Sequence, residues 1–424
     1  MLDQTHVIPL TIEDCPFAAD RSKAFVLRHI QPANQTTVDA VEAFRLQLGC
    51  QNRTGIKRAI CGFLQACKVL STAKVKTLSF PSAKSAYDDD GGGYKAFMSV
   101  KEKLINGGWI TQERKAAADH GRATIFRLNK SPETEGLKFS ETSTNHVLRV
   151  NREKLKSLED YEKQNNEKLQ PIRRKDLLVN FGASLIEAEE ERIKSIVSYL
   201  SDHPLQLGGT EYRSLWRIFN NGSLQLGGRL YAGYSGLPKA LRSTAAIDGH
   251  SVCQVDIKAS YLCVRAGMAG ASFEEGTDPY QLVPWVDPAN DRTRKMAKQL
   301  ISALISCGGN KRSFPQGMRG EFGDIIQRKQ TIKDYRDPIH EVFPFLLQEV
   351  DGLSVMYQES EVMTAVLERS IEADLPAWPL HDCLFVKEDD HRKAVTIIKE
   401  VFTSKIGFTP TVTVTDRELV ESNI

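Results

Sequence analysis

The feature that most constrains this chain is a pair of acidic side chains inside apolar segments. Asp256 lies in "GHSVCQVDIKASYL" (249–262) and Asp382 in "LPAWPLHDCLFV" (375–386). Apolar runs of this length predict strands that enter a core, where an unpaired carboxylate costs several kcal/mol. The two positions are 126 residues apart. The sequence therefore predicts two adjacent strands whose carboxylates converge, and two carboxylates in one place need cations.

Charge is spread unevenly along the 424 residues, although the net charge is only +2. Residues 1–180 hold 29 Lys and Arg against 21 Asp and Glu, and residues 51–130 alone hold 15 against 6. Residues 181–424 hold 27 against 33. A basic module beside an acidic one indicates that the first faces a polyanion such as a nucleic acid. A solvated basic surface is the other interpretation of the same excess.

No segment approaches 18 consecutive apolar residues, so the sequence predicts no membrane span and no membrane partner. The first 20 residues lack the basic start of a secretory signal. The eight Cys include no CxxC pair, so neither a zinc site nor a disulfide framework is indicated. We therefore expect reduced thiols in a cytoplasmic protein.

Residues 1–149 are expected to form a nucleic-acid-binding region. Within them, 95–129 has the pattern of a helix, a Gly-Gly stop and a hairpin whose tip carries Lys115 and Arg122. This order resembles winged-helix domains, which contact nucleic acid through a helix and the wing; protein contact is the alternative use. A charged, Pro-broken segment at 150–182 is expected to be a helical linker, and a second domain is expected at 183–424.

Cationic residues lie upstream of and between the two Asp. In "RKMAKQLISALISCGG" (294–309), Arg294 and Lys298 share one helix face and could grip a triphosphate, although an exposed basic helix start is the simpler interpretation of the spacing alone. In "GGRLYAGYSGLPKALR" (227–242), Arg229 follows two glycines and Arg242 ends the segment. Glycines permit close backbone approach, and arginines there could contact a nucleic-acid backbone or base edges.

The order of these pieces resembles family A DNA polymerases and their relatives, the single-subunit RNA polymerases. The segment 227–242 is similar to the family's Gly-Arg stretch, "VDIKASYL" to motif A, 294–309 to motif B and "LHDCLFV" to motif C. The resemblance spans about residues 180–420. It implies an α+β fold in which a winged-helix module precedes a compact right-hand polymerase core, with an antiparallel palm sheet and helical fingers.

The resemblance also implies roles for the matched residues. Asp256 and Asp382 would bind two Mg²⁺ ions, for which Mn²⁺ could substitute, and the carbonyl of Ile257 would add a ligand. Lys298 would neutralise and protonate the leaving group. The other matched residues are Arg294 on the phosphates, Tyr261 beside the sugar, His381 at the primer end, and Arg229 and Arg242 on template or primer.

Three positions depart from the family pattern. Motif B normally ends in Tyr-Gly, where this chain has Ser306-Cys307. Cys383 stands where the DNA polymerases carry Glu, closer to the RNA polymerase branch. Tyr261 stands where the DNA polymerases carry a sugar-excluding Glu. These departures leave the preference between ribose and deoxyribose open.

The expected function is template-dependent nucleotidyl transfer, by a DNA polymerase or primase-polymerase of a plasmid, phage or other mobile element. Its expected partners are a DNA template and primer, NTPs or dNTPs, and a helicase or small accessory subunit. One alternative is a single-subunit RNA polymerase-like enzyme, and another is a non-catalytic winged-helix initiator or regulator with a degenerate palm. A third is an HD-type phosphohydrolase, which would need further metal ligands such as His340 and His391.

Overall fold

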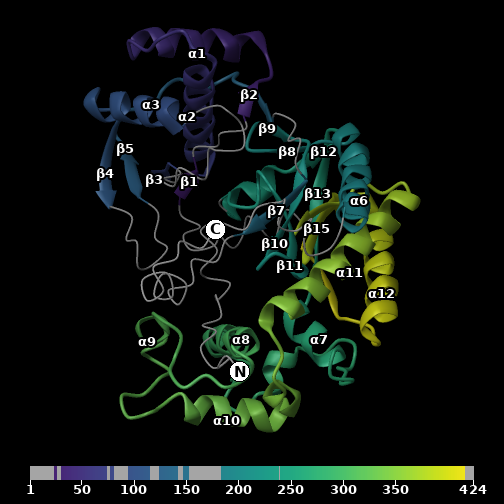
Figure 1. Ribbon diagram of the computed structural model, residues 1–424. Helices are drawn as coiled ribbons and strands as arrows, with labels where there is room; N and C mark the ends of the chain where they lie inside the picture. Colours follow the sequence, from purple (N-terminus) through teal and green to yellow (C-terminus); the bar gives the residue numbers. More distant parts are fainter. Residues whose placement is uncertain are drawn as a thin grey trace.

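The computed structural model (Figure 1) describes most of the chain between residues 23 and 415. The described ranges are 23–25, 30–73, 77–80, 94–114, 124–141, 147–151, 183–237 and 239–415. The predicted wing-tip residues Lys115 and Arg122 lie outside the described residues, as does the predicted linker from 152 onward.

Near the N-terminus, three helices pack with a small sheet (Figure 1). The helices are α1 (Gln35–Gln47), α2 (Thr54–Ala73) and α3 (Tyr94–Asn106). The sheet has the order β1-β3-β5-β4, with β1 (Lys23–Phe25), β3 (Thr77–Ser79), β4 (Ile110–Arg114) and β5 (Ile125–Leu128). The predicted helix is confirmed as α3, which buries Phe97, Val100 and Leu104 because their spacing puts them on one face. The predicted hairpin strands are confirmed as β4 and β5, which pair antiparallel.

A nine-stranded sheet contains strands from both halves of the sequence. Its order is β14-β15-β13-β12-β8-β9-β6-β2, and β16 also pairs with β13. The strands are β2 (Ile30–Pro32), β6 (Phe139–Glu141), β8 (Leu205–Leu207), β9 (Thr210–Tyr212), β12 (Ala246–Ile247), β13 (His250–Ile257), β14 (Trp378–Leu380), β15 (Cys383–Lys387) and β16 (Val412–Thr415). Because β6 pairs with β9, hydrogen bonds cross the boundary predicted at 149. The division into domains stays a prediction.

A three-stranded sheet also crosses that boundary. Its order is β11-β10-β7, with β7 (Leu148–Asn151), β10 (Leu215–Asn220) and β11 (Ser223–Ala232). The long helix α11 (Gly352–Glu372) packs along β11. The register between β10 and β11 shifts at Phe219, opposite Gly227. This irregularity bends the strand directly before Arg229.

The second half of β13 has an antiparallel neighbour on each side. There β13 lies between β15, which it pairs along 252–256, and β16, which it pairs along 254–257. Four buried side chains, Val252, Cys253, Val255 and Ile257, tie β13 to the core. Helix α12 (His391–Ile406) packs against this part of the sheet.

The remaining helices complete the molecule (Figure 1). They are α6 (Ala183–Asp202), α7 (Ser260–Gly267), α8 (Asp291–Ser306), α9 (Met318–Glu321) and α10 (Lys333–Val342), with short 3-10 turns at Lys239–Thr244, Pro279–Leu282, Pro344–Leu347 and Glu388–Asp390. Figure 1 shows α8, α9 and α10 at the end of the molecule opposite α1. In the described part of the chain, no helix is long and apolar enough to cross a membrane.

Candidate nucleotidyl-transfer site

The His-Asp pair forms the turn of a β-hairpin. The sequence predicted that Asp382 lies on a strand, and this is wrong: β14 ends at Leu380, β15 begins at Cys383, and these two residues pair with each other. His381 has a φ of +61°, the left-handed conformation that a two-residue turn between antiparallel strands requires. The polar pair interrupts an apolar run because the chain reverses there, while the strands on both sides stay buried.

Asp256 is the penultimate residue of β13 and lies beside this turn. It pairs in register with Cys383, and the next residue, Ile257, donates its backbone N–H to the carbonyl of Asp382 at 3.2 Å. The chain then turns sharply into α7 at Ala259, which has a φ of +55°. The predicted adjacency of the two segments is confirmed: Asp256 on β13 lies beside the turn that carries Asp382.

The pKa values of both carboxyl groups are raised. Burial raises the pKa of Asp256, and the charge of Asp382 raises it further. Burial also raises the pKa of Asp382, followed by the charge of Glu359 on α11. Lys298 opposes both shifts, so its ammonium group lies close enough to act on both carboxylates. Two carboxylates in a poorly solvated place keep their charges only with a cation nearby.

Arg294, which shares its helix α8 with Lys298, is held by a carboxylate that the sequence did not point to. Its Nε donates to Oδ2 of Asp278 at 2.5 Å, and the guanidinium lies over the ring of Tyr280 at 5.3 Å. The Asp278 side chain is only 4% exposed. Lys298, in contrast, is exposed. The bond from Arg294 to Asp278 uses Nε alone, so the two Nη groups of the guanidinium can still bind a phosphate group while Asp278 holds the side chain.

The two arginines expected on nucleic acid also have protein partners. Arg229 pairs with Glu359 of α11, whose side chain is 3% exposed. Arg242 donates to Oε1 of Gln254 on β13 at 2.9 Å. Both arginines still act on the site, since Arg229 opposes the rise in the pKa of Asp382 and Arg242 the rise in that of Asp256. Their positive charges therefore help to keep the two carboxyl groups ionised.

The glycines before Arg229 allow a close approach within the protein itself. A Cβ at Gly228 would lie 2.7 Å from Nη2 of Arg217, and the Nε of Arg217 donates to the Gly228 carbonyl at 2.6 Å. Arg217 is fully buried and also bonds Glu189 and Glu361. The close backbone approach that the glycines were predicted to permit is thus made by the Arg217 guanidinium. Its bonds link β11 to α6 and α11.

Tyr261 lies where α7, α8 and α11 meet. Its hydroxyl donates to the Gly352 carbonyl at 2.8 Å, and the residue is only 7% exposed. A Cβ at Gly352 would lie 2.7 Å from the Cα of Ser306, at the end of α8. Gly352 therefore lets the start of α11 lie directly against Ser306 at the end of α8. On the other side of the site, the ring of His381 contacts Tyr231 edge-on, with 5.9 Å between ring centroids.

The donor set suits a hard divalent cation that also binds substrate. In the described part of the chain, no group of three or more His, Cys, Asp or Glu side chains is arranged to hold a metal ion. Mg²⁺ at phosphate-transferring sites usually takes one or two protein carboxylates and completes its shell with waters and substrate phosphates. Asp256 and Asp382, with their raised pKa values, are the residues that would hold it.

Sequence reasoning missed Glu359, Asp278 and Arg217. On a helix pattern, the acids of "YQESE" (357–361) are typical of an exposed face, yet Glu359 is 2% exposed. The one available signal for Arg217 was its place in the apolar strand "LWRIFN", since a guanidinium there needs buried partners. Asp278 had a weaker one, because an Asp directly before Pro279 is typical of a helix cap.

Comparisons with known proteins add little to this geometry. No protein-family model matches the chain, and no similar curated protein was found. Among solved structures, the chain is similar to the POL domain of Pol1 from M. smegmatis, solved in complex with DNA primer-template and dNTP. The TM-score is 0.33 and the sequence identity 10%, over 96% of this chain and 70% of that one. A likeness of this size establishes no shared fold, and the interpretation of the site rests on its own residues.

Proposed function

We propose that this chain is a template-dependent nucleotidyltransferase, a DNA polymerase or primase-polymerase that replicates a plasmid, phage or other mobile element. One observation carries the proposal: Asp256 and Asp382 meet at a strand pair, joined by the bond from the N–H of Ile257 to the carbonyl of Asp382, with Lys298 acting on both. Paired carboxylates beside an exposed cation are the arrangement that phosphoryl transfer uses, since positioning and charge neutralisation supply most of its catalysis.

In the proposed reaction, a 3′-hydroxyl attacks the α-phosphorus of a bound nucleoside triphosphate, and the bond to the β-phosphate breaks to release pyrophosphate. Asp256 and Asp382 would hold two Mg²⁺ ions, which when bound lower the pKa of the hydroxyl and stabilise the attacking and leaving oxygens. Lys298, which is exposed, would neutralise the leaving pyrophosphate and give it a proton. Arg294, held at its Nε by Asp278, would orient the phosphates through its Nη groups. Tyr261, braced by its bond to Gly352, would face the sugar.

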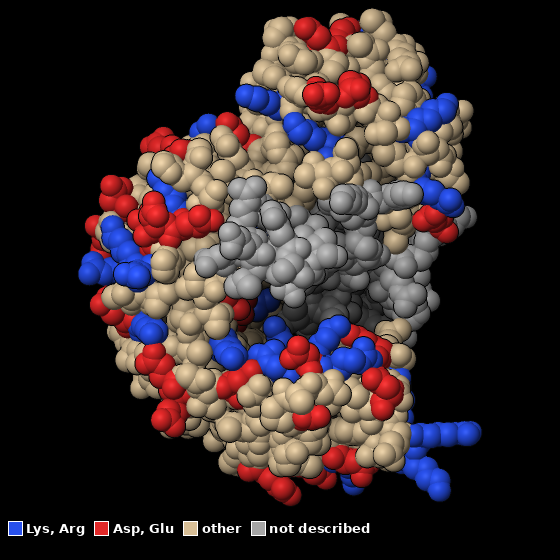
Figure 2. Space-filling model, turned by 180° about the vertical axis from the view of Figure 1, so that it is seen from behind, with Lys and Arg blue, Asp and Glu red and all other residues tan. Residues whose placement is uncertain are grey.

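A nucleic-acid strand is the second expected ligand. Figure 2 shows Lys and Arg side chains, with some Asp and Glu among them, gathered in a band below the middle of one face of the molecule. The order α3, β4, β5 with β3 beside β5 supports a winged-helix module in the N-terminal part. His381 at the hairpin turn would lie at the primer end. Arg229 and Arg242 would contact the template or primer.

The test is incorporation of labelled nucleotides on single-stranded DNA, with and without a primer, with dNTPs and rNTPs in parallel and Mg²⁺ present. Asp256→Asn and Asp382→Asn should each lower the rate by roughly a thousandfold, because several kcal/mol of charge stabilisation are lost. Asp389→Asn is the matched control, since Asp389 is an exposed acid seven residues from Asp382.

Inactivity of the wild-type chain on every template with both nucleotide types would refute the proposal in favour of a non-catalytic initiator or regulator. Activity with rNTPs alone would favour the RNA polymerase-like alternative. If Asp382→Asn kept its rate while the wild-type chain was active, the assignment of the metal ligands would be wrong.

A further inference from the structure

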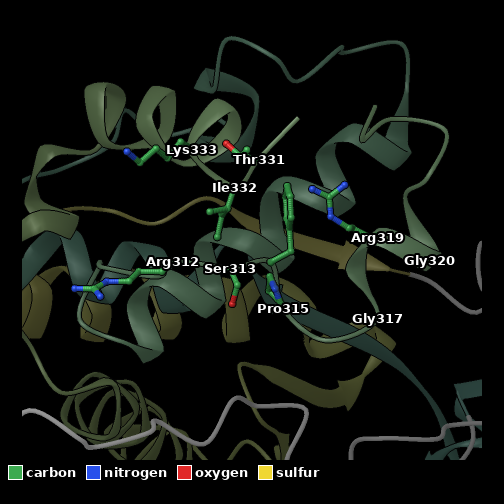
Figure 3. A pocket seen from close by; sticks show the side chains of 10 residues that line it. Arg312, Ser313, Pro315, Gly317, Arg319, Gly320, Thr331, Ile332 and Lys333 are labelled. Carbon is green, nitrogen blue, oxygen red and sulfur yellow. The ribbon is translucent and has the colours of Figure 1, made fainter. Parts of the chain in front are cut away.

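A cavity of about 620 Å³ lies in the segment that connects α8 to α10 (Figure 3). Its size falls within the roughly 300–1,000 Å³ that is usual for small-molecule sites. None of its lining residues belongs to the site built around Asp256 and Asp382. Figure 3 shows Arg312 and Lys333 on one side of the cavity and Arg319 on the other.

The cavity is lined by cations that have no carboxylate partner. Arg312, Arg319 and Lys333 line it, and no acidic residue does. Within the described structure none of the three forms an ion pair, and Arg319 donates only to the carbonyl of Gln330. Seven Lys and Arg stand against four Asp and Glu between positions 311 and 337, although the half of the chain that contains them is acidic. One pair lies within this segment, between Arg336 and Asp337 at 2.6 Å.

The other three acids of that segment are engaged with cations that do not line the cavity or with Thr331. Glu321 pairs with Lys295 at 2.6 Å and Asp324 with Arg292 at 2.7 Å. Asp334 accepts from the backbone N–H of Thr331 at 2.6 Å and from its hydroxyl at 2.9 Å. The positive charge around the cavity is therefore not neutralised locally, which favours an anionic ligand.

Between the cations, the wall is apolar and partly aromatic. Phe314 lines the cavity with Ile332 and Pro315, and the guanidinium of Arg319 stacks over the Phe314 ring at 4.7 Å. Tyr335 braces the other edge of that ring at 5.9 Å between centroids. Stacked Arg and aromatic groups bind planar bases. At Gly320 the space around a Cβ is open for at least 4 Å, so that position offers room for a ligand.

The cavity is fastened to the helix that carries the proposed triphosphate residues. Arg292 and Lys295, both in the first turns of α8, form the ion pairs with Asp324 and Glu321 that hold the segment around α9. Both cations also lie over the ring of Phe322, at 5.6 and 6.0 Å. A ligand in the cavity therefore contacts a unit that is bonded to α8.

We infer that this cavity is a second nucleotide-binding site, for a nucleoside phosphate that is either free or one unit of a single strand. Arg312 and Lys333 bind the phosphate, and the Phe314–Arg319 stack contacts the base. The inference does not depend on the proposed catalysis, because it uses none of the residues of that site.

The test is equilibrium binding to the full chain. EDTA removes metal ions, and every protein compared carries Lys298→Ala, which removes a cation from the other site; together they suppress triphosphate binding there. The probes are a fluorescent ATP analogue and a fluorescein-labelled oligo(dT). The double variant Arg312→Ala/Lys333→Ala should weaken binding at least roughly tenfold, since two charge-assisted bonds are lost. Arg328→Ala/Lys329→Ala, which removes the same charge from exposed positions that do not line the cavity, should change it less than about twofold.

A third variant separates shape from charge. Gly320→Leu extends a side chain into the open space and should weaken binding without changing its salt dependence, whereas the Arg312/Lys333 variant should lower the slope of log K against log salt for the oligonucleotide by about 1 per lost contact. Loss for the ATP analogue identifies a free nucleotide as the ligand, and loss for oligo(dT) alone identifies a single strand. Equal effects of the two double variants, or no binding of either probe by the parent, would overturn the inference.

Discussion

Replacing Gly228 by alanine tests the brace that holds β11 behind the candidate site. The new Cβ would lie 2.7 Å from Nη2 of Arg217 and 3.0 Å from Cε1 of Phe219. A free arginine would swing aside at little cost, but Arg217 is fully buried and bonds the Gly228 carbonyl, Glu361 and Glu189. The substitution must therefore break a buried ion network, which costs about 3–5 kcal/mol.

Gly249→Ala is the matched control. Gly249 has a φ of +79°, close to the +68° of Gly228, but a Cβ there would meet nothing within 4 Å. Both variants share the strain of a left-handed alanine, about 1–2 kcal/mol, and the smaller gain from a less flexible unfolded chain. The difference between them isolates the contact with Arg217, so Gly228→Ala should be less stable than Gly249→Ala by about 3–5 kcal/mol.

The assay is urea unfolding followed by tryptophan fluorescence, to which Trp216, next to Arg217, contributes. Nucleotide incorporation provides a second readout, because Arg229 directly follows the substituted glycine; it should fall in Gly228→Ala and persist in Gly249→Ala. If the two variants unfolded at the same urea concentration, Arg217 would not be packed against Gly228 and the account of this brace would be wrong.

Two further predictions concern buried carboxylates. Glu141 is 6% exposed, and burial raises its pKa from 4.5 to about 7, although the Ser214 hydroxyl and backbone N–H groups partly offset the shift. Because the folded-state pKa is the higher one, the fold loses up to about 3 kcal/mol as the pH rises from near 4.5 through 7; Glu141→Gln should abolish this loss between pH 5 and 8 in urea unfolding, and its persistence would contradict the assignment. Glu359→Gln should destabilise the chain by about 3–5 kcal/mol, since it leaves Arg229 buried without a counter-charge. Adding Arg229→Met should recover most of that stability, and purely additive losses would show that the two side chains do not pair.

Local structure around the site could be predicted from the sequence because short-range patterns encode it. The apolar residues of 249–262 predicted a strand, which is β13. The four-residue spacing of Arg294 and Lys298 placed both on α8. Even so, their surroundings differ, because Arg294 pairs with the buried Asp278 and Lys298 is exposed. Spacing determines a shared helix face, but not what packs against that face.

The hairpin shows where sequence reasoning failed and why. An apolar run with a polar pair inside it fits a strand or two strands with a turn, and the run from 375 to 386 contains neither Asn-Gly nor Asp-Gly to favour the turn. Only the fold decides, by pairing Leu380 with Cys383 and Cys383 with Asp256. A shift of one residue in the pairing of β13 with β15 would point the Asp256 side chain to the other face of the sheet.

The sequence by itself indicated individual elements such as α3, α8 and β13, and that the segments of two acids in apolar surroundings lie side by side. Tertiary structure alone decided the partners: Glu359 for Arg229, 130 positions away, and Glu189 and Glu361 for Arg217. The physical reason is range. Backbone periodicity acts over a few residues, whereas an ion pair depends on the distance between two charges in space, which is set only when the sheets and helices pack.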